Sequence, residues 1–126
     1  MAIVGMDRCV LRANPALCAL LGYAEGDMRG MSMDELIDAG HVPTEAALME
    51  SLAAGEMEAY TLETRLRHAS GRWIAVQKIV SLVRDAAGAP YCTIGQVQDL
   101  SEREAKEYAA LAARAMDIVE EERTRL

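Results

Sequence analysis

The sequence contains no phenylalanine, a single tryptophan and only three cysteines, and each shortage excludes a class of protein. With so few aromatic rings there is no stacking platform for nucleic-acid bases. Cys9, Cys18 and Cys92 are odd in number and widely spaced, so neither a disulfide framework nor a clustered metal site is predicted. We expect these thiols to behave as small buried hydrophobic side chains.

Basic charge and long apolar runs are equally lacking. The 20 acidic residues outnumber the 13 basic ones, and the net charge of −7 argues against nucleic acid as a partner. No stretch approaches the roughly 18 consecutive apolar residues that suggest a membrane span, and residues 1–4 lack the features of a signal peptide. These absences make a cytoplasmic location the default expectation, with no membrane partner for this stretch of chain.

The N-terminal part of the sequence predicts two strands and then a helix. Strands are expected over residues 2–6 and 9–13, with a short turn between them. Asn14 followed by Pro15 is typical of a helix start, and Gly22 is typical of the end of that helix. A chain of 126 residues is long enough for one domain with one core.

Short helices are predicted for the segment 24–55. Ser32 fits a helix N-cap, with a glutamate three residues later, and predicts a helix over residues 33–39. Thr44 is expected to cap a further helix that runs to about residue 54.

The pattern changes to an alternation of period two after residue 58. Strands are predicted over residues 59–67, 73–84 and 91–98, with turns between them. Two strands, several short helices and three more strands make an α+β domain, in which helices are inserted into an antiparallel sheet.

The last part of the sequence predicts one long helix. Residues 101–126 contain no glycine and no proline, and Ser101 with Glu104 has the spacing of a capping box. At 1.5 Å per residue this helix would be about 39 Å long, too long to fold back over so small a sheet. We therefore expect a globular domain over residues 1–100 and a linker helix over residues 101–126.

Several strings in this order resemble motifs of the PAS family. They lie at residues 13–23, 70–73, 81–88 and 96–103, together with Gly30. The resemblance spans about residues 2–104, nearly the whole predicted domain. It implies a five-stranded antiparallel sheet of order 2-1-5-4-3, with short helices over one face and any ligand cavity between the two layers. It also implies a sensor without chemistry of its own, and no catalytic grouping is evident in the residue spacing.

Strand alternation marks one face of the predicted sheet as the face toward the helices, and a small ligand would contact this face. The residues of this candidate pocket are Leu62, Leu66, Ile74, Val76, Lys78, Val80, Gly95 and Val97. A buried lysine is costly unless it is paired. We expect Lys78 to be partly exposed, or turned outward by a bulge that brings Ile79 inward; pairing with a buried carboxylate or an anionic ligand is the alternative.

No cofactor is required by the sequence, and its identity is left open. The resemblance allows heme, but the two histidines, His41 and His68, are poorly placed as axial ligands. It also allows non-covalent flavin, although Ile74 and Val97 stand where flavin-binding relatives often have polar groups. The string that carries the reactive cysteine of light-sensing relatives is absent, so a photochemical adduct is not expected.

The junction between the sheet and the long helix is the predicted signal relay. By resemblance, Asp99 tethers the end of the sheet to the start of the helix, where Ser101 and Glu104 form the cap. A negative charge near a helix N-terminus is favourable in any case.

The long helix carries two overlapping seams with coiled-coil spacing, which predict a parallel homodimer. The first seam contains Tyr108, Leu111, Ala115, Ile118 and Glu122, and the second contains Tyr108, Ala112, Ala115, Val119, Glu122 and Leu126. The charged Glu122 weakens the core of both seams at that position. The helix is expected to shift between these registers during signalling. The alternative is a single helix packed on its own sheet.

The function expected from these features is a sensory input domain that binds a small ligand or cofactor, dimerises, or does both, and relays a signal to a covalently linked output domain. Residues 119–126 resemble the run before the phosphoacceptor helix of some sensor histidine kinases, so a kinase output of a two-component system is favoured over a cyclic-dinucleotide enzyme. A ligand-free module that only dimerises and relays strain is the rival interpretation.

Overall fold

The computed structural model describes residues 1–125; Leu126, the last residue of the predicted linker helix, lies outside the described residues. The strands are β1 (Ala2–Gly5), β2 (Val10–Ala13), β3 (Ala59–Arg67), β4 (Trp73–Arg84) and β5 (Pro90–Asp99). The helices are α1 (Pro15–Leu21), α2 (Glu25–Met28), α3 (Met33–Leu36), α4 (Val42–Ala53) and α5 (Ser101–Arg125), with a 3₁₀ turn, η1 (Ala39–His41), before α4.

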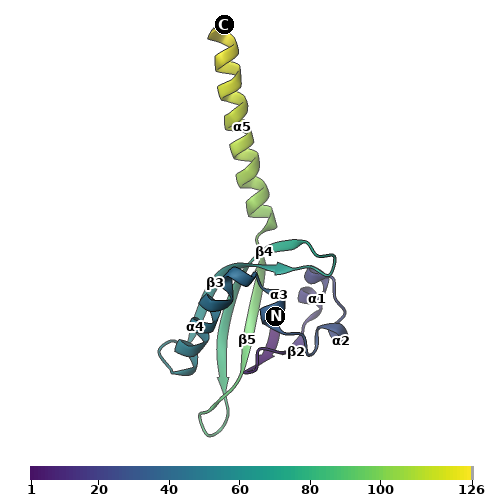
Figure 1. Ribbon diagram of the computed structural model, residues 1–126, viewed down its shortest axis with the longest axis vertical. Coiled ribbons are helices and arrows are strands. Elements are labelled where there is room, and N and C mark those ends of the chain that lie inside the picture. Colours follow the sequence, from purple (N-terminus) through teal and green to yellow (C-terminus); the bar gives the residue numbers. More distant parts are fainter. Residues whose placement is uncertain (126) are drawn as a thin grey trace.

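The five strands form one antiparallel sheet of order β2-β1-β5-β4-β3, which confirms the predicted order (Figure 1). The core lies where the short helices cover one face of this sheet. There Leu17, Leu21 and Leu36 from the helices pack with Ile74 and Val76 of β4. Burial of these side chains is the main stabilising term for a domain of this size.

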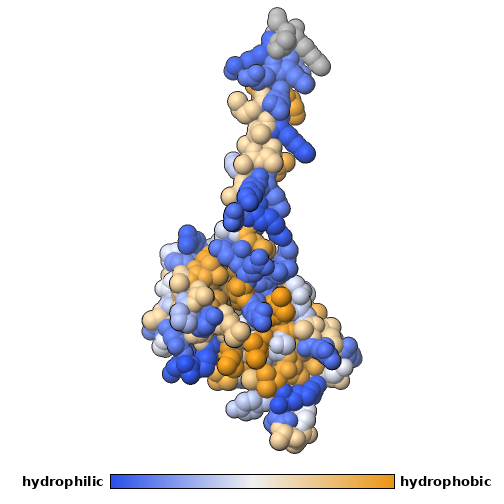
Figure 2. Space-filling view, turned by 180° about the vertical axis from the view of Figure 1, so that it is seen from behind, coloured by the Kyte–Doolittle hydropathy of each residue, from blue (hydrophilic) through white to orange (hydrophobic). Residues whose placement is uncertain are grey.

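The opposite face of the sheet is left open by the helices. Trp73 and Ile79 point outward from β4, and Leu11 adds a further exposed apolar side chain near β2. In the view from behind, hydrophobic residues cover much of the globular part of the molecule (Figure 2). Several apolar side chains of this face are therefore in contact with solvent in the single chain.

Two predicted helix boundaries are wrong, for local reasons. The helix expected over residues 33–39 ends at Leu36, because Ile37 adopts an extended conformation and bridges to Leu66 of β3. Thr44 does not cap the next helix, which begins at Val42 and has a proline in its first turn. Pro43 suits that position, since its fixed backbone angle is already helical and it has no N–H to satisfy.

The long helix α5 stands away from the globular part as a single projecting rod (Figure 1). All residues from Ser101 to Arg123 are exposed. The alternative in which this helix packs on its own sheet is therefore wrong. No helix among the described residues is both long enough and apolar enough to cross a membrane.

Candidate functional site

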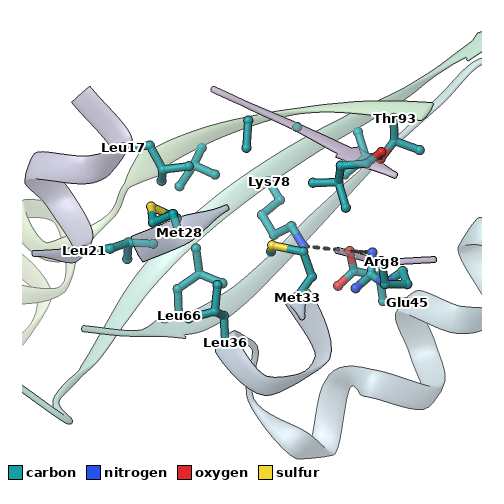
Figure 3. A pocket seen from close by; sticks show the side chains of 15 residues that line it. Arg8, Leu17, Leu21, Met28, Met33, Leu36, Glu45, Leu66, Lys78 and Thr93 are labelled. Carbon is teal, nitrogen blue, oxygen red and sulfur yellow. Dashed lines mark hydrogen bonds and ion pairs between the residues drawn. The ribbon is translucent and has the colours of Figure 1, made fainter. Parts of the chain in front are cut away.

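A small internal cavity lies between the sheet and the short helices (Figure 3). Most of its wall is apolar, and the helices contribute Leu17, Leu21, Met28, Met33 and Leu36. The free space is about 30 Å³, room for roughly two or three water molecules. Pockets for drug-sized ligands are typically about 300–1,000 Å³, so a flavin or a heme would need these side chains to move apart.

The structure brings most of the predicted pocket residues to this cavity. Those that line it are Leu66, Lys78, Val80, Gly95 and Val97. The remaining three do not reach its wall: Ile74 and Val76 are buried in the surrounding core, and Leu62 packs against it. The alternation of the strands thus identified the correct face, and the packing of the helices decides which part of that face is hollow.

Lys78 is buried with only 3% of its surface exposed, so the expectation that it is partly exposed or turned outward is wrong. Its strand keeps a regular register here, with Lys78 opposite Leu62 on one side and Val97 on the other. The irregularity of β4 lies farther along, between Val83 and Arg84. The lysine remains inside because it is paired, as the alternative expectation required.

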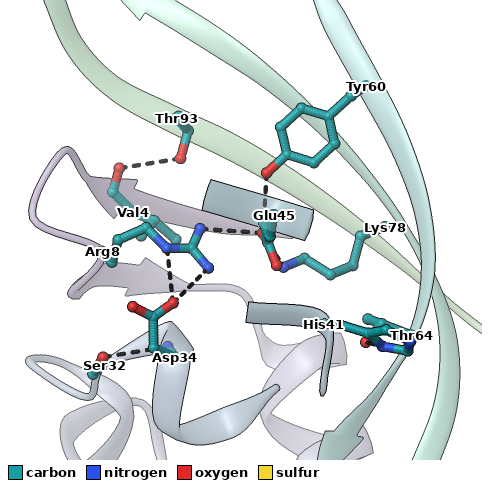
Figure 4. A network of polar contacts seen from close by, with 10 residues as sticks. All are labelled: Val4, Arg8, Ser32, Asp34, His41, Glu45, Tyr60, Thr64, Lys78 and Thr93. Atoms are coloured by element: carbon teal, nitrogen blue, oxygen red, sulfur yellow. Dashed lines mark hydrogen bonds and ion pairs between the residues drawn. The ribbon is translucent and has the colours of Figure 1, made fainter. Parts of the chain in front are cut away.

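The partner of Lys78 is Glu45 of α4, which is 1% exposed. Its Oε1 accepts hydrogen bonds from Lys78 Nζ at 2.6 Å, from Arg8 at 3.1 Å and from the Tyr60 hydroxyl at 3.0 Å. Arg8 also bonds Asp34, at 3.1 Å, so the cluster extends toward the surface (Figure 4). Two cations and two carboxylates are present, and the formal charge of the group is zero.

Local structure places these side chains together. Glu45, Met49 and Leu52 are spaced by four and three residues, so they share the face of α4 that turns toward the sheet. Arg8 lies in the turn between β1 and β2 and has a φ of 71°. This left-handed conformation is uncommon for a residue with a side chain.

The electrostatics of the cluster favour an ionised Glu45. Burial opposes ionisation of the carboxyl, but the charges and hydrogen bonds of Lys78 and Arg8 outweigh it and hold its pKa below the ordinary value. Burial lowers the pKa of Lys78, and the attraction of Glu45 opposes that change. Burial and the neighbouring carboxylate also raise the pKa of Tyr60, which stays a hydrogen-bond donor.

One oxygen of the Glu45 carboxylate has no hydrogen-bond partner among the described residues. All three bonds described above end on Oε1, and Oε2 is buried and unpaired. Glu45 lines the cavity beside Lys78 and Arg8. A buried acceptor without a donor costs free energy comparable to a lost hydrogen bond, so a donor group placed in the cavity would be stabilised there.

Sequence reasoning missed Glu45 and Arg8. A signal for Glu45 was present, because it shares a helical stripe with Met49 and Leu52 and therefore belongs on a buried face. Strand alternation places Lys78 on the sheet face toward the helices, and helical spacing places Glu45 on the buried face of its helix. Together these two positions suggest an ion pair. No comparable signal marked Arg8, whose side chain is directed by the shape of its turn.

The histidines and cysteines do not form a further site. His41 Nδ1 lies 2.6 Å from the hydroxyl of Thr64, and His68 contacts Ser70 in the β3–β4 turn, so neither lines the cavity. Cys92 is buried, while Cys9 and Cys18 are only partly buried, contrary to the expectation for all three. No group of three potential metal ligands occurs in the described part of the chain.

Asp99 joins the end of β5 to the start of α5. Its Oδ1 accepts hydrogen bonds from the Ser101 backbone N–H at 2.8 Å and from the Ser101 hydroxyl at 2.6 Å, and these bonds lower the pKa of Asp99. Neither bond of the predicted capping box forms. Asp99, rather than Glu104, receives the N–H of Ser101, while the Glu104 N–H bonds the carbonyl of Leu100.

A second link between α5 and the sheet was not foreseen. Arg103 forms two parallel hydrogen bonds with Glu63 of β3, at 3.0 and 3.1 Å. These bonds lower the pKa of Glu63 and raise that of Arg103. Both residues are exposed, so nothing in their sequence pattern distinguished them from other charged surface residues. Together with Asp99, the pair fixes the base of the rod to two different strands.

Comparison with known proteins agrees with this architecture. The family model described as the PAS fold matches residues 10–97. The probable diguanylate cyclase DgcE of Escherichia coli K12 is 33% identical over 102 residues, which cover 81% of this chain. The chain spans only 9% of the length of that relative.

Solved structures show the same fold. A light-oxygen-voltage domain studied with a flavin analogue superposes with a TM-score of 0.69 at 20% identity, covering 90% of this chain and 86% of that chain. A sensory box histidine kinase/response regulator from Burkholderia thailandensis E264 gives a TM-score of 0.64 at 20% identity, with coverages of 90% and 86%. The family match, the strand order and the helices over one sheet face lead to one assignment: the chain belongs to the PAS family of sensory, non-catalytic domains.

Proposed function

We propose that this domain detects a small molecule in its internal cavity and relays the change through α5 to a linked output domain. The observation that carries the proposal is the course of β5. Gly95 and Val97 line the cavity, and Asp99, two residues farther along the same strand, holds Ser101 at the start of α5. A displacement of β5 at the cavity therefore reaches the base of the rod along one strand.

The signalling unit in this proposal is a parallel homodimer with α5 as its coiled coil. Exposed apolar residues support this, because Tyr108, Leu111, Ile118 and Val119 are 75%, 63%, 61% and 46% exposed in the single chain. A second copy of α5 would cover them, since both seams have the spacing of coiled-coil core positions. The rod shifts between the seam of Leu111 and the seam of Ala112 when the signal changes.

The output is an enzyme of the bacterial signalling class. The diguanylate cyclase relative supports a cyclic-dinucleotide synthase, because its 33% identity covers most of this chain. The resemblance of the last residues to the run before a phosphoacceptor helix supports a histidine kinase instead. Of the two we favour the cyclase, since its support extends over 102 residues and not over one short string. In either case the domain acts in the cytoplasm as the regulatory part.

The rival function is a ligand-free module that only dimerises. The cavity of about 30 Å³ is the observation in its favour, because so small a space can be an ordinary packing defect. The unpaired Glu45 Oε2 at the cavity argues against it, since packing defects in cores are normally apolar.

Cysteine crosslinking along α5 tests the relay. Single cysteines that replace Leu111 or Ile118 crosslink when the first seam is in contact, and those that replace Ala112 or Val119 crosslink when the second seam is in contact. We expect both sets to crosslink between subunits, with their ratio changing when the cavity is filled. A single pattern that never changes would contradict the register shift, and no crosslinking at either seam would contradict the dimer.

A further inference from the structure

The polar end of the cavity, formed by Arg8, Glu45 and Lys78, restricts what can bind there. Glu45 Oε2 is a buried acceptor with no donor among the residues the structure describes, and it lies in a carboxylate that is 1% exposed. An occupant that donates a hydrogen bond would satisfy it. A purely apolar occupant would leave it unpaired, which disfavours such a molecule.

The charges of the cluster restrict the occupant further. Arg8 and Lys78 carry two positive charges, and Glu45 and Asp34 carry two negative ones, so the formal charge of the cluster is zero before anything binds, with Asp34 at its surface end, where 46% of the side chain is exposed. A carboxylate or an ammonium group would add an uncompensated charge to this buried site, at considerable cost. A neutral donor adds none.

Lys78 supplies the complementary group. Its ammonium carries three hydrogens, and its bond to Glu45 Oε1 uses one of them. A hydroxyl group in the cavity can accept a hydrogen bond from such an ammonium while it donates one to a carboxylate oxygen. A hydroxyl can therefore form a hydrogen bond with Lys78 and another with Glu45 at the same time.

The rest of the wall sets the size and polarity of the ligand. Leu17, Leu21 and Leu36 offer only hydrocarbon, and the free space of about 30 Å³ admits a short chain at most. Met28 and Met33 also line the cavity, and their unbranched side chains can shift to enlarge it.

From these restrictions we infer that the cavity binds a small neutral alcohol, with its hydroxyl between Glu45 Oε2 and Lys78 Nζ and its hydrocarbon part among the leucine and methionine side chains. This inference rests on the proposed sensory function and names the class of ligand. Water alone is the competing occupant.

Methyl NMR of the whole chain, with ¹³C-labelled methionine, tests the inference at pH 7. The probes are 1-propanol, propionate and propylammonium, which share one hydrocarbon chain and differ in charge. We expect saturable shifts of the Met28 and Met33 methyl signals with 1-propanol, and binding of the two charged probes weaker by about tenfold or more. The exposed Met1 methyl, which neither lines the cavity nor lies on α5, serves as the internal control for general solvent effects.

The double variant Glu45→Leu/Lys78→Met removes the ion pair at the polar end and keeps apolar bulk, while Arg8 retains its bonds to Asp34. It should lose the preference for the alcohol over the charged probes. Equal binding of all three probes to the unaltered protein, or shifts at Met28 that only follow those at the exposed Met1, would overturn the inference without any variant.

The outcomes separate this inference from the proposed function. If 1-propanol saturates the Met28 and Met33 signals but leaves the α5 crosslinks unchanged, the relay fails and the site stands. If no probe binds while both seams crosslink, the site fails and the dimeric relay stands.

Discussion

Lys78 of β4 and Glu45 of α4 form an ion pair of 2.6 Å in the interior, with side chains 4% and 1% exposed. The pair joins the sheet to the longest of the covering helices at the edge of the cavity. Buried ion pairs rarely stabilise a fold more than well-packed apolar residues would, because both charges lose their hydration. The pair lies beside the cavity, where the proposed ligand would contact it.

The first prediction concerns the energetics of this pair. Glu45→Leu alone leaves Lys78 as a buried cation without its carboxylate, and should lower the free energy of unfolding by about 3–5 kcal/mol. Adding Lys78→Met should recover part of that loss, since the two apolar side chains can pack together while Arg8 and the Tyr60 hydroxyl still lack their acceptor. Urea unfolding of the three proteins measures this. Losses in the single variants that simply add in the double variant would show that the two residues are not coupled.

The second prediction is a loss of stability in acid. The pKa of Glu45 is lower in the folded protein than its ordinary value of 4.5, so the unfolded chain binds the proton more readily. The contribution to stability is therefore complete above pH 4.5 and is lost as the pH falls through the folded pKa. Urea unfolding between pH 7 and pH 3 should show this decline.

The double variant Glu45→Leu/Lys78→Met is the control for the pH experiment. It lacks the buried carboxyl but keeps Asp99 and Glu63, whose pKa values are also lowered by their hydrogen bonds. The free energy of unfolding of this variant should fall less between pH 7 and pH 3 than that of the unaltered protein. Two identical pH profiles would mean that Glu45 does not contribute.

Much of the fold was predictable, because it depends on patterns that are local in sequence. Strand alternation gave β3 and β4 with correct bounds, and Asn14 does cap α1, by accepting a hydrogen bond from the N–H of Leu17. The errors arose where a distant partner decides. Ile37 leaves its helix to bridge Leu66, and Lys78 stays inside because a carboxylate 33 residues away meets it.

The candidate site was predictable only in part for the same reason. The sheet wall of the cavity follows from the alternation of side chains along the strands, and five of the eight residues predicted for the pocket line it. The polar end combines residues from the first turn, α4 and β4, and no short window of sequence contains them together. The link between Arg103 and Glu63 spans 40 residues and joins two exposed side chains, so it had no signal of burial or periodicity.

The third prediction concerns that link. Arg103→Gln removes both hydrogen bonds to Glu63, and should hardly change the melting temperature, because exposed ion pairs contribute little. Amide hydrogen exchange in the first turn of α5 should become faster, since one of its two attachments to the sheet is gone. Arg114→Gln, the same change farther along the helix, is the matched control. Unchanged exchange at residues 101–105 would show that the link does not hold the rod.

The fourth prediction concerns the register of the coiled coil. Ala115 belongs to both seams, whereas Met116, its neighbour, belongs to neither. Ala115→Glu places a charge at the centre of the interface in either register, and should separate the subunits. Met116→Glu introduces the same charge on the outside, and should leave the dimer intact.

Light scattering of the whole chain and of these two variants shows whether two copies share the projecting helix. We expect a dimer for the unaltered protein and for Met116→Glu, and a monomer for Ala115→Glu at the same concentration. A monomer for the unaltered protein at high concentration, or a dimer that survives Ala115→Glu, would contradict that expectation.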